Sequence, residues 1–237
     1  MHITWLGHAT FELRLASGET ILIDPWMEND APFGNPSYPK GYKVSRCDTI
    51  LITHGHFDHI AGVAAVAQEF SPSAVVANYE IASYFEQKGV KNTIGMNKGG
   101  TVQAGSLRVT MTHAVHSSTI VDGDRVLPAG EPCGFVLHLP DGRRAYFAGD
   151  TAVHSDMQIV EKLYRPELCF LPIGDLYTMG PEQAALAVRM LRPKTVIGMH
   201  YGTFPPLTGT PAALAKRIAD LPDTKLIVLE PGVAVSW

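Results

Sequence analysis

Four side chains of the kinds that bind metal ions are concentrated in the seven residues from Thr53 to His59. They are His54, His56, Asp58 and His59. Three imidazoles and one carboxylate suit zinc, and they also accept manganese, iron or nickel. Imidazoles two residues apart can converge on one cation from a turn, and Asp58 and His59, on the next bend, can reach a second cation. The competing interpretation is a solvated histidine-rich loop.

The residues on either side indicate where this loop lies. Residues 49–52, Thr-Ile-Leu-Ile, are apolar and β-branched, which predicts a buried strand. Apolar residues recur at helical spacing from Ile60 to Phe70, which predicts an amphipathic helix. The loop then connects the carboxyl end of a strand to a helix, which is where α/β sheets bind their ligands. This agreement between residue types and flanking pattern favours the metal site.

The spacing His-x-His-x-Asp-His resembles the signature of the metallo-β-lactamase superfamily. Other passages carry the same resemblance along essentially the whole chain: Thr4-Trp-Leu-Gly-His-Ala-Thr, Ile23-Asp-Pro, Ala148-Gly-Asp-Thr, Leu171-Pro-Ile-Gly-Asp, Thr178-Met-Gly-Pro-Glu and His200-Tyr-Gly-Thr-Phe-Pro. The chain is most similar to the branch of bacterial metal-dependent hydrolases. That branch also resembles ascorbate-6-phosphate lactonase and, more distantly, N-acyl-phosphatidylethanolamine phospholipase D.

The resemblance implies three further ligands downstream, and His116, Asp150 and His200 follow in the expected order. The implied allocation is one ion on His54, His56 and His116, a second ion on Asp58, His59 and His200, and Asp150 as the bridge between them. Two divalent ions about 3.5–4 Å apart activate a shared water, so that hydroxide attacks a carbonyl carbon or a phosphorus atom. Zinc is the expected metal, with manganese, iron or nickel as alternatives.

Several other residues are candidates for supporting roles. His8, in the first predicted turn, is either a buried core residue or a catalytic group that faces the metal pocket. Asp24 either caps a turn or holds a ligating histidine through its second ring nitrogen. Asp58 could also orient the attacking water or move its proton. His113, a neighbour of the predicted ligand His116, Tyr177 and His8 are candidates to protonate the leaving group.

The order of the predicted elements fits the fold that the resemblance implies. An initial strand meander is followed by alternating strands and helices, which predicts a single domain over residues 1–237. The implied fold is the α/β, four-layered αβ/βα sandwich, with two mixed sheets flanked by helices. Residues 26–46 are rich in Pro, Gly, Asn and Tyr, which predicts a flap over the site. The aromatic side chains of this flap either line an apolar substrate groove or pin the loop to the surface; they are Trp26, Phe33, Tyr38 and Tyr42.

Composition restricts the partners and the compartment. The net charge is −4, and no basic run is longer than Arg143-Arg144, which argues against non-specific nucleic-acid binding. The chain shows no signal-peptide pattern and no apolar stretch of membrane-spanning length, and its three cysteines are widely spaced. We therefore expect a cytoplasmic protein that acts on a small molecule. Its loop-rich faces permit a homo-oligomer.

These observations favour a metal-dependent hydrolase of a small ester, lactone or phosphate ester. One alternative is a metal-dependent phosphodiesterase or nuclease acting on RNA. The negative net charge of the chain argues against this alternative. The other alternative is a metal-binding protein without turnover. Seven ligand candidates argue against that second alternative, because a structural zinc site needs only four. A serine hydrolase has little support, since the chain has no Gly-x-Ser-x-Gly motif.

Overall fold

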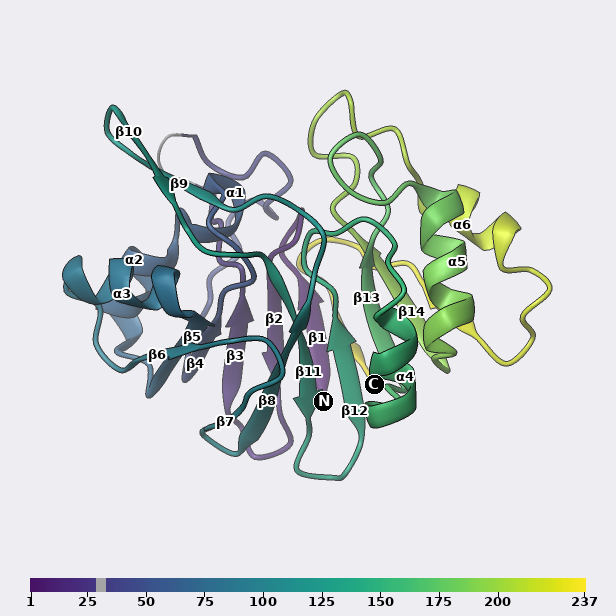
Figure 1. Ribbon diagram of the computed structural model, residues 1–237, viewed down its shortest axis with the longest axis horizontal. Helices are drawn as coiled ribbons and strands as arrows, with labels where there is room; N and C mark the ends of the chain where they lie inside the picture. Colours follow the sequence, from purple (N-terminus) through teal and green to yellow (C-terminus); the bar gives the residue numbers. More distant parts are fainter. Residues whose placement is uncertain (29–32) are drawn as a thin grey trace.

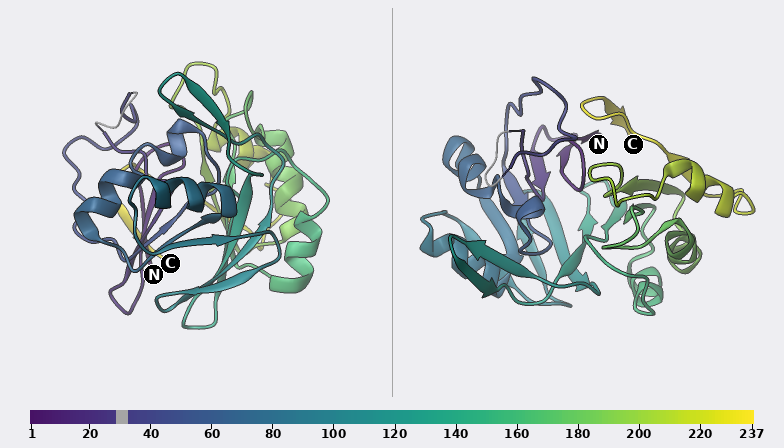
Figure 2. Two further views of the ribbon diagram at one scale, coloured as in Figure 1. Left: turned by 60° about the vertical axis from the view of Figure 1, so that its left-hand side comes forward. Right: turned by 90° about the horizontal axis from the view of Figure 1, so that it is seen from above.

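Two mixed β-sheets face each other at the centre of the protein, and each carries helices on its outer face (Figure 1). A computed structural model describes residues 1–28 and 33–237. Helices α2 and α3 cover one sheet, and α4, α5 and α6 cover the other, as the turned views also show (Figure 2). This arrangement confirms the predicted four-layered αβ/βα sandwich.

The first sheet has seven strands in the order β16-β1-β2-β3-β4-β5-β6. Its strands are β1 (His2–Trp5), β2 (Phe11–Arg14), β3 (Thr20–Ile23), β4 (Thr49–Leu51), β5 (Ala74–Asn78), β6 (Thr93–Met96) and β16 (Ala234–Ser236). The meander β1-β2-β3 is antiparallel, whereas β3 to β6 run parallel. The helices of this half are α1 (Phe57–Ile60), α2 (Val63–Phe70) and α3 (Tyr79–Gln87).

The second sheet also has seven strands, in the order β15-β14-β13-β12-β11-β8-β7. Its strands are β7 (Thr101–Ala104), β8 (Leu107–His113), β11 (Cys133–His138), β12 (Arg144–Phe147), β13 (Leu168–Pro172), β14 (Thr195–Met199) and β15 (Lys225–Ile227). A separate hairpin is formed by β9 (Thr119–Asp122) and β10 (Arg125–Pro128). The helices are α4 (Met157–Tyr164), α5 (Pro181–Leu191) and α6 (Pro211–Arg217).

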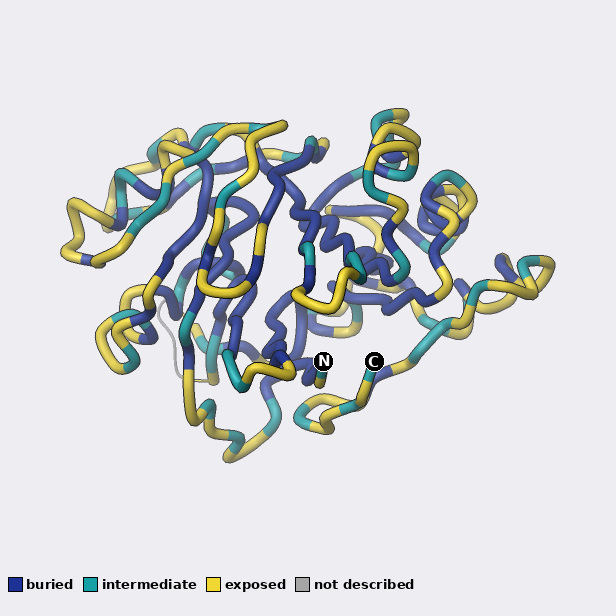
Figure 3. The backbone as a smooth tube through the Cα atoms, turned by 90° about the horizontal axis from the view of Figure 1, so that it is seen from below, coloured by how far each residue is buried: buried dark blue, intermediate teal, exposed yellow. Residues whose placement is uncertain are grey.

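The core between the sheets is apolar and aromatic. Phe11 from the first sheet meets Phe147 and Phe170 from the second, with ring centroids 5.7 and 5.0 Å away. All three side chains are fully buried. The inner strands of both sheets are accordingly buried along most of their length, whereas the edge strands β6, β7, β15 and β16, the turns and the outer helix faces are largely exposed or half-buried (Figure 3). This packing fixes the two sheets relative to each other, and therefore also the loops at their ends.

The helix predicted for residues 60–70 is two helices. Helix α1 already begins at Phe57, so Asp58 and His59 lie in a helical turn and not in a loop. The helix is interrupted between α1 and α2 at Gly62, whose backbone N–H donates to the carbonyl of Pro25 at 2.9 Å. Apolar spacing alone did not reveal this break, because it depends on a contact with a distant turn.

Part of the predicted flap, residues 29–32, lies outside the described residues. In its described part, Trp26 is fully buried and its indole N–H donates to the carbonyl of Phe33 at 2.9 Å. Tyr38 is also buried, and the Asn35 side-chain amide donates to the carbonyls of Leu6 and Trp26. The described segment is therefore pinned to the body of the protein at Trp26, Asn35 and Tyr38. Phe33 remains 58% exposed.

Gly149 fixes the turn that follows β12. Its φ is +63°, and a Cβ atom there would lie 2.6 Å from the carbonyl oxygen of Cys133. Gly142 has a similar φ of +88°, but no heavy atom lies within 4 Å of the position that a Cβ atom would take there. We expect Gly149→Ala to lower the free energy of unfolding by about 2–5 kcal/mol, because strain and overlap add. We expect Gly142→Ala to cost only about 1–2 kcal/mol.

Urea unfolding of both metal-free variants measures the difference directly. Equal losses of stability would show that the turn before Asp150 yields to a methyl group.

Candidate metal centre

The predicted ligands come together at one edge of the sandwich, where parallel strands end. His54 follows β4, Asp150 follows β12, and His200 follows β14. His116 follows β8, while Asp58 and His59 lie on α1, which sits at the same edge as the β9–β10 hairpin (Figure 1). The fold therefore gathers into one site side chains that are up to about 150 residues apart in the sequence.

The first group is formed by three imidazoles. The Nδ1 atom of His56 lies 2.9 Å from Nε2 of His54 and 3.3 Å from Nε2 of His116. Burial lowers the pKa of all three rings, and the histidines around them lower it further. The rings therefore stay neutral, with lone pairs that can bind a cation.

The second group contains Asp58, His59 and His200. The Oδ2 atom of Asp58 lies 3.7 Å from Nε2 of His59 and 4.0 Å from Nε2 of His200. His59 and His200 are almost completely buried, at 0% and 2% exposed. Two nitrogens and one carboxylate oxygen at this spacing can surround one cation.

The Asp150 carboxylate lies between the two groups. Its Oδ2 atom is 3.9 Å from Nε2 of His54 and 3.7 Å from Nε2 of His116. The same oxygen is 3.4 Å from Nε2 of His59 and 2.9 Å from Nε2 of His200. One oxygen atom thus faces histidines of both groups.

Asp24 supports the candidate ligand His59 from behind. Its Oδ2 atom lies 2.8 Å from Nδ1 of His59, so the ring directs its Nε2 atom towards Asp150. The backbone N–H and the hydroxyl of Thr53 donate to the same carboxylate at 2.8 and 2.7 Å. Such partners orient a metal-binding imidazole and raise its basicity. Of the two interpretations of Asp24, the structure favours the support of a histidine.

His8 is fully buried and lies beside Asp58, outside the cavity. Its Nε2–H donates to Oδ2 of Asp58 at 2.9 Å, and its Nδ1 atom lies 2.9 Å from the hydroxyl of Thr203. Burial lowers the pKa of His8 to about 4, with a further contribution from His200. The neutral ring therefore accepts from Thr203, which in turn accepts from Ser37 at 3.3 Å. This chain of hydrogen bonds fixes the orientation of Asp58.

Three of these residues have backbone conformations that are unusual for residues other than glycine. The φ angles of His8, Asp24 and His200 are +54°, +47° and +56°. Such angles cost of order 1–3 kcal/mol and persist where the surroundings enforce them, often at functional sites. Each of the three follows the end of a strand, and the turn aims its side chain into the site.

The charges of the site fit bound cations. Asp24, Asp58 and Asp150 are buried or nearly so, and within the described residues no Lys or Arg pairs with them. Burial opposes protonation of His59, yet the surrounding carboxylates raise its pKa well above the usual value. In addition, Nε2 of His59 and Oδ1 of Asp150 are buried without a hydrogen-bond partner. Buried carboxylates need compensating positive charge, which divalent ions supply.

A cavity of about 570 Å³ opens beside both groups. Asp58, His116, Asp150 and His200 line it, so a molecule in the cavity reaches the predicted ligands. Tyr177, predicted near the site, also lines this cavity and is 56% exposed.

His113 lies outside the two groups, although it was a candidate for a supporting role. Its Nδ1 atom is 2.9 Å from the ammonium group of Lys98, and its ring packs on that of His154. Together with Asp156 these two histidines form a separate group of potential ligand atoms. Within the described residues, His113 therefore makes no hydrogen bond or ring contact with the two groups around Asp150.

Sequence reasoning missed Thr53 and Thr203, which hold Asp24 and His8. Thr53 directly precedes His54, and Thr203 lies three residues after His200. Their positions beside candidate ligands are visible in the sequence. Their partners, Asp24 for Thr53 and His8 for Thr203, are 29 and 195 residues away.

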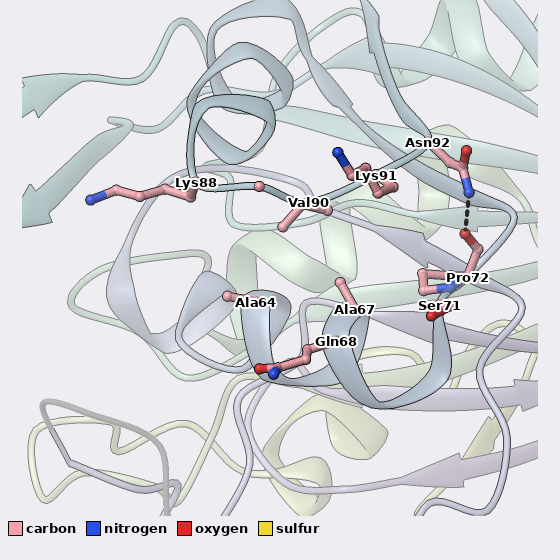
Figure 4. A pocket seen from close by; sticks show the side chains of 10 residues that line it. Ala64, Ala67, Gln68, Ser71, Pro72, Lys88, Val90, Lys91 and Asn92 are labelled. Atoms are coloured by element: carbon pink, nitrogen blue, oxygen red, sulfur yellow. Dashed lines mark hydrogen bonds between the residues drawn. The ribbon is translucent and has the colours of Figure 1, made fainter.

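A second cavity, of about 330 Å³, lies between α2 and the turn that follows α3 (Figure 4). Its lining contains no His, Asp, Glu or Cys among the described residues, so it offers no metal ligand of these types. The Asn92 amide donates to the carbonyl of Pro72 at 2.9 Å across it, while the side chain of Lys88 extends outward and pairs with Asp122. Of these two cavities, only the first is lined by candidate metal ligands within the described residues.

Residues 19–201 match the model of the beta-lactamase superfamily domain. Together with the fold and the clustered ligands, this match means that the chain belongs to the metallo-β-lactamase superfamily. Within it, the chain is a metal-dependent hydrolase, and the alternative of a metal-binding protein without turnover is set aside.

The relatives support this assignment over the full length. A UPF0173 metal-dependent hydrolase of Solibacter usitatus is 56% identical and covers 100% of both chains. Another, from Roseiflexus castenholzii, is 46% identical over 99% of this chain and 96% of its own length. The solved structure of a metallo hydrolase from Ignicoccus hospitalis is 34% identical, covers 100% of this chain and 98% of its own, and has a TM-score of 0.82. None of the helices in the described ranges is long and apolar enough to span a membrane.

Proposed function

We propose that this protein hydrolyses a small ester or lactone with the help of two divalent ions, of which zinc best matches the ligand set. The observation that carries the proposal is the position of Asp150, whose Oδ2 atom faces histidines of both groups within 2.9–3.9 Å. In this proposal His54, His56 and His116 hold one ion, Asp58, His59 and His200 hold the other, and Asp150 bridges them. When bound, divalent ions supply Lewis acidity and lower the pKa of water towards neutrality.

The residues of the chain have distinct roles in this proposal. Asp58 orients the attacking water, and His8 is a positioning residue that holds the Asp58 carboxylate. Burial would raise the pKa of Asp58, but His59 and the hydrogen bond from His8 hold it well below its usual value, so Asp58 stays ionised. This role replaces the idea that His8 protonates the leaving group, because the ring is fully buried and does not line the cavity.

Tyr177 is the better candidate to assist the leaving group. It lines the cavity and is exposed to solvent there. Its hydroxyl is a donor that a departing alkoxide can use. Asp24 acts through His59, whose ring it orients.

Removal and return of metal tests the proposal. We expect the chelated protein to be inactive, and we expect added Zn²⁺ to restore hydrolysis of a simple lactone and of 4-nitrophenyl acetate. Bis(4-nitrophenyl) phosphate serves as the competing substrate. Zn²⁺, Mn²⁺ or Ni²⁺ that restores only phosphodiester cleavage would favour the phosphodiesterase alternative, and a chelated protein with full esterase activity would contradict the proposal.

A further inference from the structure

The walls of the cavity beside the metal centre are apolar and aromatic. Beyond the predicted ligands, three separate parts of the chain form these walls. They are Phe57 on α1, Val121 on β9, and the segment Phe204-Pro205-Pro206 between β14 and α6. Ser117, Thr119 and Tyr177 add the remaining polar groups. A substrate therefore meets hydrophobic surface on several sides once its reactive group lies at the ligands.

The aromatic part of the wall is fixed in place before any substrate arrives. Phe57 and Phe204 both pack on the buried indole of Trp26, with ring centroids 5.6 and 6.0 Å away. Phe33 adds an edge-to-face contact with Phe57 at 5.1 Å. A wall built in this way costs little ordering when a ligand binds, so the contact area contributes to affinity.

The part of the wall formed by the β9–β10 hairpin is anchored to the loop that carries His54 and His56. The N–H of Gly55 donates to the hydroxyl of Ser118 at 3.1 Å, and that hydroxyl donates to the carbonyl of Ala129 at 3.1 Å. Ser118 precedes β9 and Ala129 follows β10. The two bonds therefore join the ends of the β9–β10 hairpin to each other and to Gly55, which lies between His54 and His56. Val121 of this hairpin nevertheless remains 67% exposed, although it lines the cavity. An apolar side chain of this exposure, beside a catalytic cavity, is available to contact a ligand.

Positive charge is absent from these walls. No Lys or Arg lines the cavity within the described ranges, and residues 29–32 contain neither. The charged groups that line it are Asp58 and Asp150. A carboxylate or phosphate group placed away from the reacting bond would therefore lose its hydration without gaining a cationic partner, which is costly.

We propose that the substrate is an uncharged ester or lactone that carries an aromatic or branched alkyl group, and that this group lies against Phe57, Phe204 and Val121. The inference rests on the proposed hydrolytic function and names the substrate class of that site. It separates this protein from lactonases of phosphorylated sugars and from hydrolases of nucleic acids, whose substrates keep an anionic group beyond the reacting bond.

Matched esters test the substrate class. For the protein with Zn²⁺ bound, we expect kcat/KM for 4-nitrophenyl phenylacetate to exceed that for 4-nitrophenyl acetate at least about tenfold, because buried apolar surface is gained. We compare two esters of adipic acid: the 4-nitrophenyl methyl diester, and the 4-nitrophenyl monoester, which carries a free carboxylate. We expect kcat/KM for the diester to exceed that for the monoester by about tenfold or more. Equal values, or a preference for the carboxylate, would overturn the inference.

A charge placed on the hairpin tests the location. The adipate ratio is kcat/KM for the methyl diester divided by kcat/KM for the monoester. We expect Val121→Lys to reduce this ratio about tenfold, because the lysine gives the free carboxylate a partner inside the cavity. The matched control is Val228→Lys, since Val228 is 60% exposed and does not line the cavity. The control should keep the wild-type ratio, and identical ratios in the two variants would contradict the proposed contact.

A binding measurement separates failure of this inference from failure of the hydrolytic function. Saturation-transfer NMR with the neutral ketone 4-phenylbutan-2-one reports contact without turnover. We expect a signal from its phenyl protons with wild type and with Val228→Lys, and a clear loss with Val121→Lys. If no ester is hydrolysed but this pattern holds, the proposed function fails and the apolar site stands. If esters are hydrolysed but the ketone signal is the same in all three proteins, the inference fails alone.

Discussion

Asp150→Asn should empty both metal positions together and lower ester hydrolysis about a thousandfold, since a metal ion contributes several kcal/mol and each 1.4 kcal/mol is a factor of ten in rate. In the unaltered protein, the Oδ2 atom of Asp150 lies within 4 Å of Nε2 of His54, His116, His59 and His200. An amide keeps the size of the side chain but removes its charge. The two groups of ligands then lose their shared anion, and the ions that they hold repel each other.

Elemental analysis of the purified variant, with ester hydrolysis measured on the same sample, tests this expectation. Asp156→Asn is the matched control, because Asp156 belongs to the separate group with His113 and His154. The control should keep the wild-type metal content and rate. Retention of both ions by Asp150→Asn would show that Asp150 does not bridge them.

The second large effect should separate the two ion positions. We expect His116→Ala and His200→Asn each to leave about one ion per chain and to lower hydrolysis about a hundredfold, because each removes one ligand from one position only. His200 has a φ of +56°, so we choose asparagine there, which tolerates this conformation better than alanine does.

Metal titration followed by elemental analysis distinguishes the two variants. His113→Ala provides the control, since His113 contacts Lys98 and His154, away from both positions. Loss of both ions from either variant would mean that the two positions do not bind independently. Loss of no ion would remove that histidine from the ligand set.

The clustering of the candidate metal ligands was predictable from the sequence because the strands that carry them end in recognisable turns. His54 follows an apolar strand, and Asp150 and His200 do the same, so the edge that they share follows from the α/β arrangement. The four-layered fold was predictable for the same reason, with the family resemblance supplying its topology. Their roles as ligands remain proposals.

What could not be predicted depends on contacts between distant segments. His8 had two interpretations, because its partners Asp58 and Thr203 are 50 and 195 residues away. The break at Gly62 depends on the carbonyl of Pro25. The apolar cavity was equally hidden, since Phe57, Val121 and Phe204 come from three elements whose proximity only the folded chain defines.

Anomalous X-ray scattering from a crystal grown with Zn²⁺ tests the central claim most directly. We expect two strong peaks about 3.5–4 Å apart. One should lie among His54, His56 and His116, the other among Asp58, His59 and His200, with Asp150 touching both. A single peak, or a peak only at His113 and His154, would contradict the proposed centre.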